Sequence, residues 1–484
     1  MAKRVVYGGI VTGIIALLFC GDVGACHAVA PKSTPRDGLD FSLVAACLVF
    51  LIPAGLTMIA VGASEEGRAA TVAVMGLIAI PLGVIVYALI GFGFQFGGLG
   101  LVSNLQGAQE LISEWSPLDR IWGAGWGMIG LDGFLLLGET PDAELLTLFL
   151  YQGALAATAV SIPLLALAKR VRFFALLGVG LFFGILIYPI HGNWVWGGGW
   201  LSQLGANLGL GHGFVDFAGS GTIHAAGGFV TLAGILAFGA RLGRREEVAK
   251  PPPVHFPLLA LLGTFLLLLG WFGLAAANPL LTNNVSFVQI LLNVLLAACG
   301  GVLVSALYIW FTTGSADPLM VARGMVAALV AVSASCAFLP PWAALLIGGL
   351  AGLLLPLSIY LLEVKLRIDD PTAAVAMHGI SGLWGLLALG IFADGGSGQG
   401  WNGVGAREYL GIARQGVSGL LVRSGFQPDW PQQFYAQVAG LVALLILALG
   451  LSWLVFRGLY SWASRVAEFR SQMEPIAEQS PNED

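Results

Sequence analysis

Charged side chains are scarce in this sequence. Lysine, arginine, aspartate and glutamate together make up 10% of the 484 residues, whereas 57% are hydrophobic. A soluble domain carries about 25% charged residues, so the composition excludes an ordinary soluble protein. The net charge of −5 offers no basic surface, which argues against nucleic acid as a partner. The composition therefore indicates a polytopic membrane protein.

Metal-binding and catalytic patterns are also missing. The five cysteines show neither CxxC nor Cys/His spacing, which argues against a metal site and a disulfide framework. No nucleophile–base pair or phosphate-binding loop stands out. The glycine-rich segment 91–100 ends a membrane span, where helix packing and a turn explain it. We therefore expect no cofactor, no metal and no enzyme activity.

Long apolar windows and glycine are abundant instead. A helix that crosses a membrane needs about 20 mostly apolar residues, and small residues such as the 69 glycines let such helices pack closely. The sequence predicts an all-α membrane protein with eleven transmembrane helices. The windows are 41–63, 69–95, 146–168, 173–191, 217–239, 256–276, 286–312, 318–337, 341–362, 372–393 and 434–456.

The N-terminus has the pattern of a secretory signal peptide. Lys3 and Arg4 precede an apolar stretch that ends in small residues, and Ala28 and Ala30 suit a signal peptidase. We predict that residues 1–30 are removed, and the alternative is an uncleaved first helix. The eleven-helix domain would then cover 31–456, followed by a C-terminal tail at 457–484.

The distribution of lysine and arginine predicts the orientation in the membrane. If the mature N-terminus is outside, the inner loops and tail hold fourteen of the 22 basic residues, the outer loops six and the signal peptide two. This excess on the inner side follows the positive-inside rule. We therefore expect a cell-membrane protein with its N-terminus outside and its C-terminus in the cytoplasm.

Two segments repeat in opposite orientations. In 216–228 and 370–382 an aspartate stands eight residues before a histidine, and a glycine follows the histidine by four. Asp216 lies at the outer mouth of the fifth window, and Asp370 lies at the inner mouth of the tenth. Eight residues rise about 12 Å along a helix, so His224 and His378 should meet near the middle of a core about 30 Å thick. The sequence predicts a 5+5 inverted repeat with one added helix and a polar site at the midplane.

A buried pair of histidines suits a small solute. Each neutral ring has one donor and one acceptor nitrogen, so the pair can share a hydrogen, present polar edges to a solute and relay a proton. Burial disfavours the charged imidazolium, which favours a neutral hydrogen-bonding molecule over a bare cation. The alternative is two separate packing histidines, and the inverted repeat favours the functional interpretation.

Several motifs resemble those of ammonium transporters in the ammonium transporter/methylammonium permease/Rhesus superfamily. The most specific segments are DFAGSGTIHAAGG at 216–228, NWVWGGGW at 193–200, GWFG at 270–273 and IDDPTAAVAMHGISGLWG at 368–385. The segment 151–173 gives weaker support, and the resemblance extends from about 41 to 465. It implies an ammonium-transporter-like fold with one pore per subunit, a homotrimer and selective ammonium uptake.

The resemblance also implies roles for individual residues. His224 and His378 match the twin histidines that line the pore and relay the proton. Trp196 is similar to the tryptophan at the outer recruitment site, where a cation rests on the ring face. Asp216 matches a buried acid near this vestibule, with a structural and electrostatic role. The alternative for Trp196 is an aromatic residue at the membrane interface.

The sequence departs from the family around the outer gate. Leu155 and Leu274 replace two phenylalanines, which removes cation–π attraction of roughly 0.5–2 kcal/mol each. Asn278 stands near the serine that helps to bind the cation, and our hypothesis is that its side chain compensates. Ala275 replaces a common asparagine, and Ala373 replaces an acid five residues before the second histidine.

The implied partners are ammonium or ammonia, the lipid bilayer and further copies of the chain. The tail lacks the acidic, glycine-containing pattern expected in the family, so it does not support regulation by a P-II protein. Its amphipathic segment 457–474 fits the membrane surface or a neighbouring subunit. Two functions stay open beside ammonium transport: a non-conducting ammonium-binding or sensing protein, and a pore for a neutral molecule such as carbon dioxide.

Overall fold

The computed structural model describes residues 36–103, 105, 107–136, 142–239, 256–276 and 285–477. The predicted signal peptide at 1–30 lies outside these ranges and stays a prediction. Helices dominate the described part, as the apolar windows predict. Its strands form two short antiparallel hairpins, β1 (Glu114–Trp115) with β2 (Ile129–Gly130), and β3 (Glu408–Tyr409) with β4 (Ile412–Ala413).

The first half of the bundle contains five spans. Several of them combine α-helix with a π-helical turn, in which the hydrogen bonds reach one residue further than in an α-helix. The α-helices are α2 (Arg36–Val49), α3 (Leu51–Gly62), α4 (Glu66–Val86), α5 (Phe92–Phe96), α6 (Asp119–Trp122), α7 (Ala143–Leu167), α8 (Phe173–Phe182), α9 (Tyr188–Trp196), α10 (Leu204–Leu208) and α11 (Ala226–Phe238). The π turns are η2 (Tyr87–Gly91), η5 (Phe183–Ile187) and η6 (Ser220–Ala225), and the 3-10 turns are η3 (Leu99–Leu101) and η4 (Phe134–Leu136).

The second half contains six spans. Ten helices of the described part are long and apolar enough to cross a membrane, and α14 adds an eleventh, shorter apolar helix of 16 residues. The prediction of eleven apolar helices is thus confirmed, with the eighth shorter than the window 318–337. The elements are α12 (Pro257–Ala276), α13 (Phe287–Thr313), α14 (Pro318–Ser333), α15 (Pro341–Ile359), η7 (Tyr360–Lys365), η8 (Val375–Ile380), α16 (Ser381–Phe392), α17 (Gln432–Leu444), η9 (Leu445–Leu451) and α18 (Ser452–Ala477).

The two halves pack in the same way. In the first half α7 packs against α4 and α11, and in the second half α14 packs against α13 and α16. The first span crosses the sixth at Gly55 and Gly263, where a Cβ on Gly55 would lie 2.5 Å from the Gly263 carbonyl and one on Gly263 would lie 2.7 Å from the Gly55 carbonyl. This reciprocal contact fits an inverted repeat that relates the first span to the sixth.

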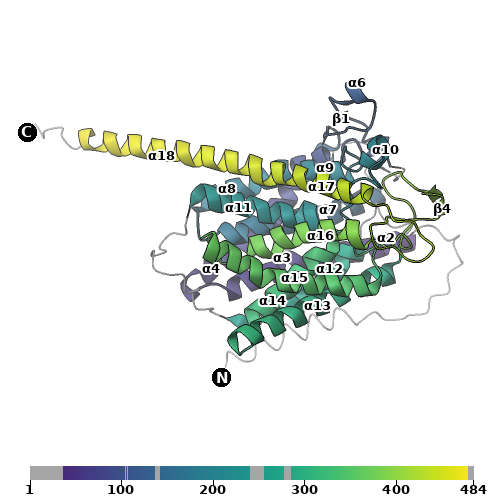
Figure 1. Ribbon diagram of the computed structural model, residues 1–484. Helices are drawn as coiled ribbons and strands as arrows, with labels where there is room; N and C mark the ends of the chain where they lie inside the picture. Colours follow the sequence, from purple (N-terminus) through teal and green to yellow (C-terminus); the bar gives the residue numbers. More distant parts are fainter. Residues whose placement is uncertain are drawn as a thin grey trace, which may run out of the picture. The chain divides into compact units, whose positions relative to one another are not determined.

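The paired aspartates lie at opposite ends of the bundle. Arg170 connects the carbonyl of Gly239, just after α11, with Asp369, just before the second repeat segment. Since Asp216 precedes the span that ends just before Gly239, Asp216 and Asp370 are at different ends. Figure 1 shows α11 and α16 within the same bundle. We call these ends the Asp216 end and the Asp370 end.

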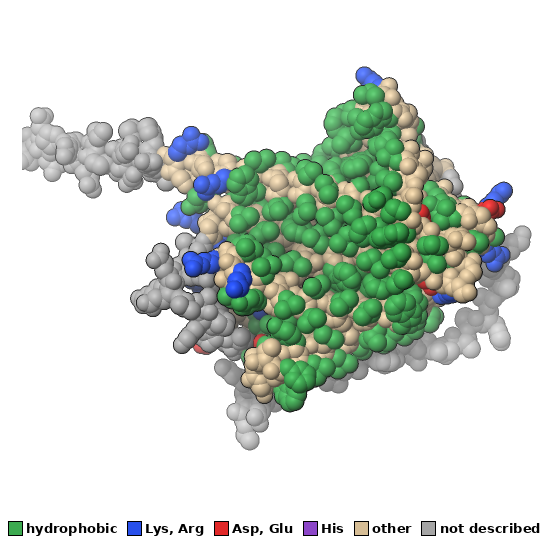
Figure 2. Space-filling model, viewed as in Figure 1, with side chains coloured by type: hydrophobic (Ala, Val, Ile, Leu, Met, Phe, Trp, Pro, Cys, Tyr) green, Lys and Arg blue, Asp and Glu red, His purple; other side chains and the backbone are tan. Residues whose placement is uncertain are grey.

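Hydrophobic side chains cover the wall of the bundle between these ends. Figure 2 shows them as a broad band, with lysine and arginine gathered at its borders. Large side chains in this wall are exposed, such as Phe311 on α13 at 76% and Leu77 on α4 at 70%. In water such a surface would be unfavourable, so it suits the hydrocarbon of a bilayer.

The last span continues into the C-terminal tail. Helix α17, the π turn η9 and helix α18 follow one another without a break, and α18 extends beyond the bundle in Figure 1. The predicted amphipathic segment 457–474 is therefore helical and belongs to α18.

Candidate functional site

The two repeat histidines lie side by side in the core. The rings of His224 and His378 are nearly parallel, at an angle of 14° and a centroid distance of 5.3 Å, and both residues are buried. On its other face His224 stacks on Trp271 of α12 at 4.8 Å and 10°. The structure thus brings the predicted pair together and adds a third ring, Trp271, which belongs to the quoted GWFG motif but had been given no role.

The ring nitrogens of the two histidines decide what the pair can bind. Neither ring nitrogen of His224, nor Nδ1 of His378, has a hydrogen-bond partner among the described residues. No hydrogen bond between the two rings is present among the described residues, and the sharing of a hydrogen stays a prediction. Their donor and acceptor atoms remain open to a small hydrogen-bonding molecule.

Both histidines lie within π turns at the start of a span. His224 belongs to η6 and His378 to η8, and in each case the helix continues as an ordinary α-helix. A π turn carries one surplus residue, which changes the direction of the side chains that follow it, and such turns are frequent at functional sites. The repeat therefore extends from the sequence to the local backbone geometry.

Glycines allow the two repeat segments to cross beside the histidines. A Cβ on Gly228 would strike the backbone of Gly379, and a Cβ on Gly382 would strike the carbonyl of Ser220 and lie 2.9 Å from the Cβ of Ala225. The glycine four residues after each histidine therefore has a packing reason. It lets the helices approach closely enough for the imidazoles to stack.

Asp216 anchors the turn that carries His224. Its Oδ2 accepts hydrogen bonds from the backbone N–H of Gly221 at 3.1 Å and of Thr222 at 2.8 Å, and from the Thr222 hydroxyl at 2.9 Å. Burial raises the pKa of Asp216 to about 6, and the hydrogen bonds from Thr222 and Gly221 oppose this rise. A carboxylate at this position stabilises the free N–H groups at the helix start.

Asp370 anchors the second turn by an equivalent arrangement. Its carboxylate accepts from the backbone N–H of Ala374 at 3.0 Å and of Val375 at 2.8 Å, and from the Thr372 hydroxyl at 3.2 Å. Burial raises the pKa of Asp370, and the bonds from Val375 and Ala374 oppose it. The aspartate of each repeat is thus a cap that fixes its histidine-bearing turn.

Two arginines hold the Asp370 end together. Arg170 forms a buried ion pair with Asp369 at 3.1 Å, and Arg323 donates to the carbonyl of Pro371 at 2.7 Å. Ala373, at the position where the sequence lacks an acid, adopts a left-handed backbone conformation with φ of 55°. A side chain is disfavoured there, so surrounding contacts must hold this residue in place.

Sequence reasoning missed His191, which extends the Asp216 cap. Nδ1 of His191 lies 3.1 Å from the Thr222 hydroxyl, which in turn donates to Asp216. Because an ionised carboxylate only accepts, the Thr222 hydrogen points at Asp216 and His191 supplies its own Nδ1–H to Thr222. A signal existed, since His191 precedes the quoted NWVWGGGW motif by only two residues.

Trp196 lies next to Asp216, as the sequence predicted. Its indole N–H donates to the backbone carbonyl of Asp216 at 2.8 Å, and 9% of the residue is exposed. The indole is thus held by the loop that leads into η6 rather than lying loose at the surface. The third predicted vestibule residue, Asn278, lies outside the described residues, so its role stays a hypothesis.

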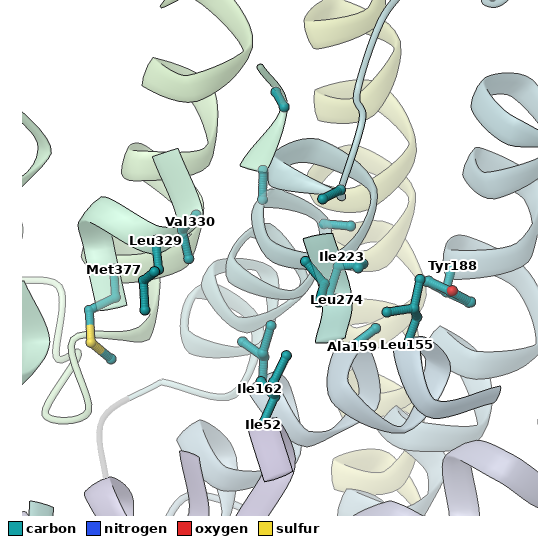
Figure 3. Close-up of a cluster of buried hydrophobic side chains, with 14 of the residues drawn as sticks. Ile52, Leu155, Ala159, Ile162, Tyr188, Ile223, Leu274, Leu329, Val330 and Met377 are labelled. Atoms are coloured by element: carbon teal, nitrogen blue, oxygen red, sulfur yellow. The ribbon is translucent and has the colours of Figure 1, made fainter. Parts of the chain in front are cut away.

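The two predicted gate leucines lie in one buried cluster. Leu155 on α7 and Leu274 on α12 are 1% and 0% exposed, and Figure 3 shows both near Ile223, the residue before His224. Tyr151, one helical turn before Leu155, donates its hydroxyl to the carbonyl of Leu274 at 2.7 Å. Buried leucine side chains therefore occupy the positions where the resemblance implies two phenylalanines.

Known proteins resemble this chain in sequence. The family model described as Ammonium Transporter Family matches residues 40–475. Ammonium transporter Amt2 of Archaeoglobus fulgidus is 35% identical over 79% of this chain and 78% of its own length. Ammonium transporter Amt1 of Methanocaldococcus jannaschii is 30% identical over 73% of this chain and 81% of its own length.

Solved structures of the same kind match the fold. A structure described as Sensor Amt Protein has a TM-score of 0.71 at 27% identity and covers 88% of this chain and 93% of its own. Mep2 of Saccharomyces cerevisiae has a TM-score of 0.67 at 23% identity and covers 88% and 85%, which supports the fold alone.

Proposed function

The chain belongs to the ammonium transporter family, and we propose that it moves ammonium or ammonia across the cell membrane through a pore lined by His224 and His378. The observation that carries the proposal is the stack of Trp271, His224 and His378 in the middle of the bundle. Its unpartnered ring nitrogens offer a buried, neutral molecule both donors and acceptors. An apolar pore with few polar atoms in its described lining favours ammonia over a hydrated ion.

In this proposal the Asp216 end is the outer side. The predicted positive-inside distribution assigns the acidic, aromatic loop 96–145 to the outside, and assigns Arg170 and Arg323 to the cytoplasmic side. Ammonium then meets Trp196 first, where the ring face attracts a cation. Beyond the leucines it transfers its proton to an unpartnered ring nitrogen of His224, and ammonia continues past the histidines.

The caps at both ends support the same mechanism. Asp216 and Asp370 fix the turns that carry the histidines, so each imidazole is held in place before a solute arrives. Since a neutral histidine can accept a proton at one nitrogen and release one at the other, the pair can relay the proton that ammonium gives up. Both aspartates act here as positioning groups rather than as solute ligands.

We also propose that the chain assembles as a homotrimer in the bilayer, as the family resemblance implies. The tail lacks the acidic, glycine-containing pattern expected in the family, so it gives no support for control by a P-II protein. The tail helix fits the membrane surface or a neighbouring subunit.

The test is solid-supported-membrane electrophysiology on the purified protein in liposomes. We expect ammonium pulses to give a saturable current, and the double substitution His224→Ala/His378→Ala to abolish it. Gel filtration and a melting curve would show that the double variant is folded. A wild-type-like current from the folded double variant would refute the histidine pore.

A silent wild-type protein would favour one of the two alternatives. Ammonium that binds without a current would point to a sensing member, which the Sensor Amt Protein neighbour makes worth testing. Carbon dioxide flux without ammonium current would point to a neutral-gas pore, which the aliphatic gate of Leu155 and Leu274 suggests.

A further inference from the structure

We propose that His191 is a positioning residue of the outer end of the pore: through Thr222 it keeps the Asp216 carboxylate ionised, and so it determines the lowest external pH at which ammonium is taken up. The effect on uptake rests on the proposed function, because it needs a pore that ammonium enters at the Asp216 end. The effect of His191 on Asp216 can be measured without transport.

The two oxygens of Asp216 are used unequally. Oδ2 accepts three hydrogen bonds, from the N–H of Gly221, the N–H of Thr222 and the Thr222 hydroxyl. Oδ1 is buried and has no hydrogen-bond partner among the described residues. A proton can therefore bind at Oδ1 without displacing a donor. What opposes its binding is the strength of the donors at Oδ2, because they favour the charged form.

Asp216 differs from its counterpart in the second repeat by the absence of a cationic neighbour. At the other end of the bundle the positive charge of Arg323 acts on Asp370. Within the described part of the chain, the groups that favour the ionised form of Asp216 are hydrogen-bond donors, whereas burial favours the protonated acid. The ionisation of Asp216 therefore depends on how strongly these donors are polarised.

His191 strengthens the hydroxyl donor. Its Nδ1 lies 3.1 Å from the Thr222 hydroxyl oxygen, which lies 2.9 Å from Oδ2 of Asp216. Since the Thr222 hydrogen points at the carboxylate, His191 donates to the Thr222 oxygen. A hydroxyl that accepts a hydrogen bond becomes a better donor, because consecutive hydrogen bonds polarise one another where the dielectric constant is low. The three side chains belong to residues at most 2% exposed, so bulk water does not replace these bonds.

The surroundings of this hydrogen-bonded series are uncharged in the described structure. Trp194 and Phe214 pack against the His191 ring at centroid distances of 6.0 and 6.1 Å. Just beyond α14, Cys336 is a titratable group near Asp216, and a buried thiol stays protonated between pH 5 and pH 8. The proton affinity of Asp216 is therefore controlled by its hydrogen bonds.

An ionised Asp216 favours a cation at the outer end. Its backbone carbonyl accepts from the Trp196 indole at 2.8 Å, so the negative charge lies beside the predicted recruitment residue, where burial limits screening. As the external pH falls through the pKa of Asp216, which is about 6, the carboxylate is protonated and this attraction is lost. Without the hydrogen bond from His191 the pKa rises, so uptake should fail at a higher pH.

His191→Leu and His191→Asn are a matched pair of variants. Both side chains branch at the same atom, but only asparagine has an N–H donor near the place of Nδ1. Infrared titration of the protein in lipid follows the carbonyl band of protonated Asp216, which is identified by its loss in Asp216→Asn. We expect the midpoint to rise by about half a pH unit in His191→Leu, a threefold gain in proton affinity. In His191→Asn it should stay near the wild-type value.

Thr222→Val tests the route. This substitution removes the direct donor, so the midpoint should rise by about one pH unit. Adding His191→Leu should then have no further effect, because the series is already interrupted. Ammonium currents of the same proteins in liposomes should decline at the midpoints of the infrared titration, and melting curves at pH 8 show that the variants are folded.

Three infrared results would overturn the inference. They are a wild-type midpoint in His191→Leu, an equal rise in His191→Asn, and a full further rise when His191→Leu is added to Thr222→Val. Currents that do not follow the infrared midpoints would overturn the link between Asp216 and uptake. A wild type without ammonium current would contradict the proposed function, whereas the infrared titration would still decide whether His191 acts on Asp216.

Discussion

At the scale of single residues, the caps of the histidine turns depend on very few hydrogen bonds. Asp216 uses one oxygen for three donors, two of which come from Thr222. Asp370 divides its donors between both oxygens and receives help from Thr372. The cap at the Asp216 end is thus the more concentrated one, and Thr222 is its central residue.

Substituting Thr222→Val should destabilise the protein, because a buried carboxylate loses a hydroxyl donor and His191 loses its acceptor. We expect a loss of about 1.5–3 kcal/mol, as for other hydrogen bonds to charged groups. Thermal unfolding in detergent at pH 8, where Asp216 is ionised, measures it. Thr222→Ser keeps the hydroxyl, so its melting temperature should stay near that of the wild type. A Thr222→Val protein with the melting temperature of the wild type would contradict the role of the cap.

His212, a histidine that lies outside the membrane spans, gives a prediction for acidic pH. His212 is fully buried beside the ring of Tyr409, at a centroid distance of 4.4 Å, and burial lowers the pKa of His212 to about 4. In the unfolded chain the pKa is about 6.5, so the fold favours the neutral ring. Above about pH 6.5 the ring is neutral in both states, and the folded protein has its full stability. As the pH falls towards 4, the unfolded chain takes up a proton that the folded protein does not, so the free energy of unfolding falls by about 3 kcal/mol.

Melting curves of wild type and His212→Phe between pH 7 and pH 4 test this. The wild type should lose stability relative to the variant as the pH falls, because only the wild type takes up this proton. Asp429 accepts a hydrogen bond from the Tyr409 hydroxyl at 3.0 Å and has a raised pKa, so its protonation raises the stability of the folded protein as the pH falls. This contribution is present in both proteins and cancels in the comparison. Parallel curves would show that His212 does not titrate as described.

At the scale of elements, the site depends on a close crossing of two helices. Gly228 faces the backbone of Gly379, which cannot move aside as a flexible side chain could. We expect Gly228→Ala to force the two histidine-bearing segments apart, with loss of the ammonium current and a lower melting temperature. Gly178→Ala on α8 is the control, because a Cβ there meets nothing within 4 Å. A conducting Gly228→Ala protein would contradict the need for this crossing.

The same elements show how far the sequence could predict the site. The spacing from Asp216 to His224 to Gly228 recurs from Asp370 onward, and this pattern is enough to locate the paired histidines. The π turns could not be predicted, because a surplus residue in a helix depends on packing and leaves no local pattern. The hydrogen bond from Tyr151 to Leu274 could not be predicted either, since 123 residues separate its partners in the chain.

At the scale of the whole molecule, the orientation can be tested by cysteine labelling of intact cells. Arg407 lies in the exposed β3–β4 region at the Asp216 end, and Lys365 ends the exposed turn η7 at the Asp370 end. A membrane-impermeant maleimide should label Arg407→Cys in intact cells and Lys365→Cys only after permeabilisation. The wild-type protein measures the background labelling of the native cysteines. The reverse labelling pattern would contradict the proposed topology with the N-terminus outside.

The π turns have a consequence for how such a site changes over generations. A helix has a phase, meaning the direction in which each successive residue faces, and a surplus residue shifts that phase for everything beyond it. Deleting one residue from η6 would restore ordinary α-helical geometry and turn His224 by about 100° relative to its capped start. In this molecule the length of a helical turn, as much as the identity of a side chain, decides which residue faces the pore, so gain or loss of one codon can exchange the lining without any substitution.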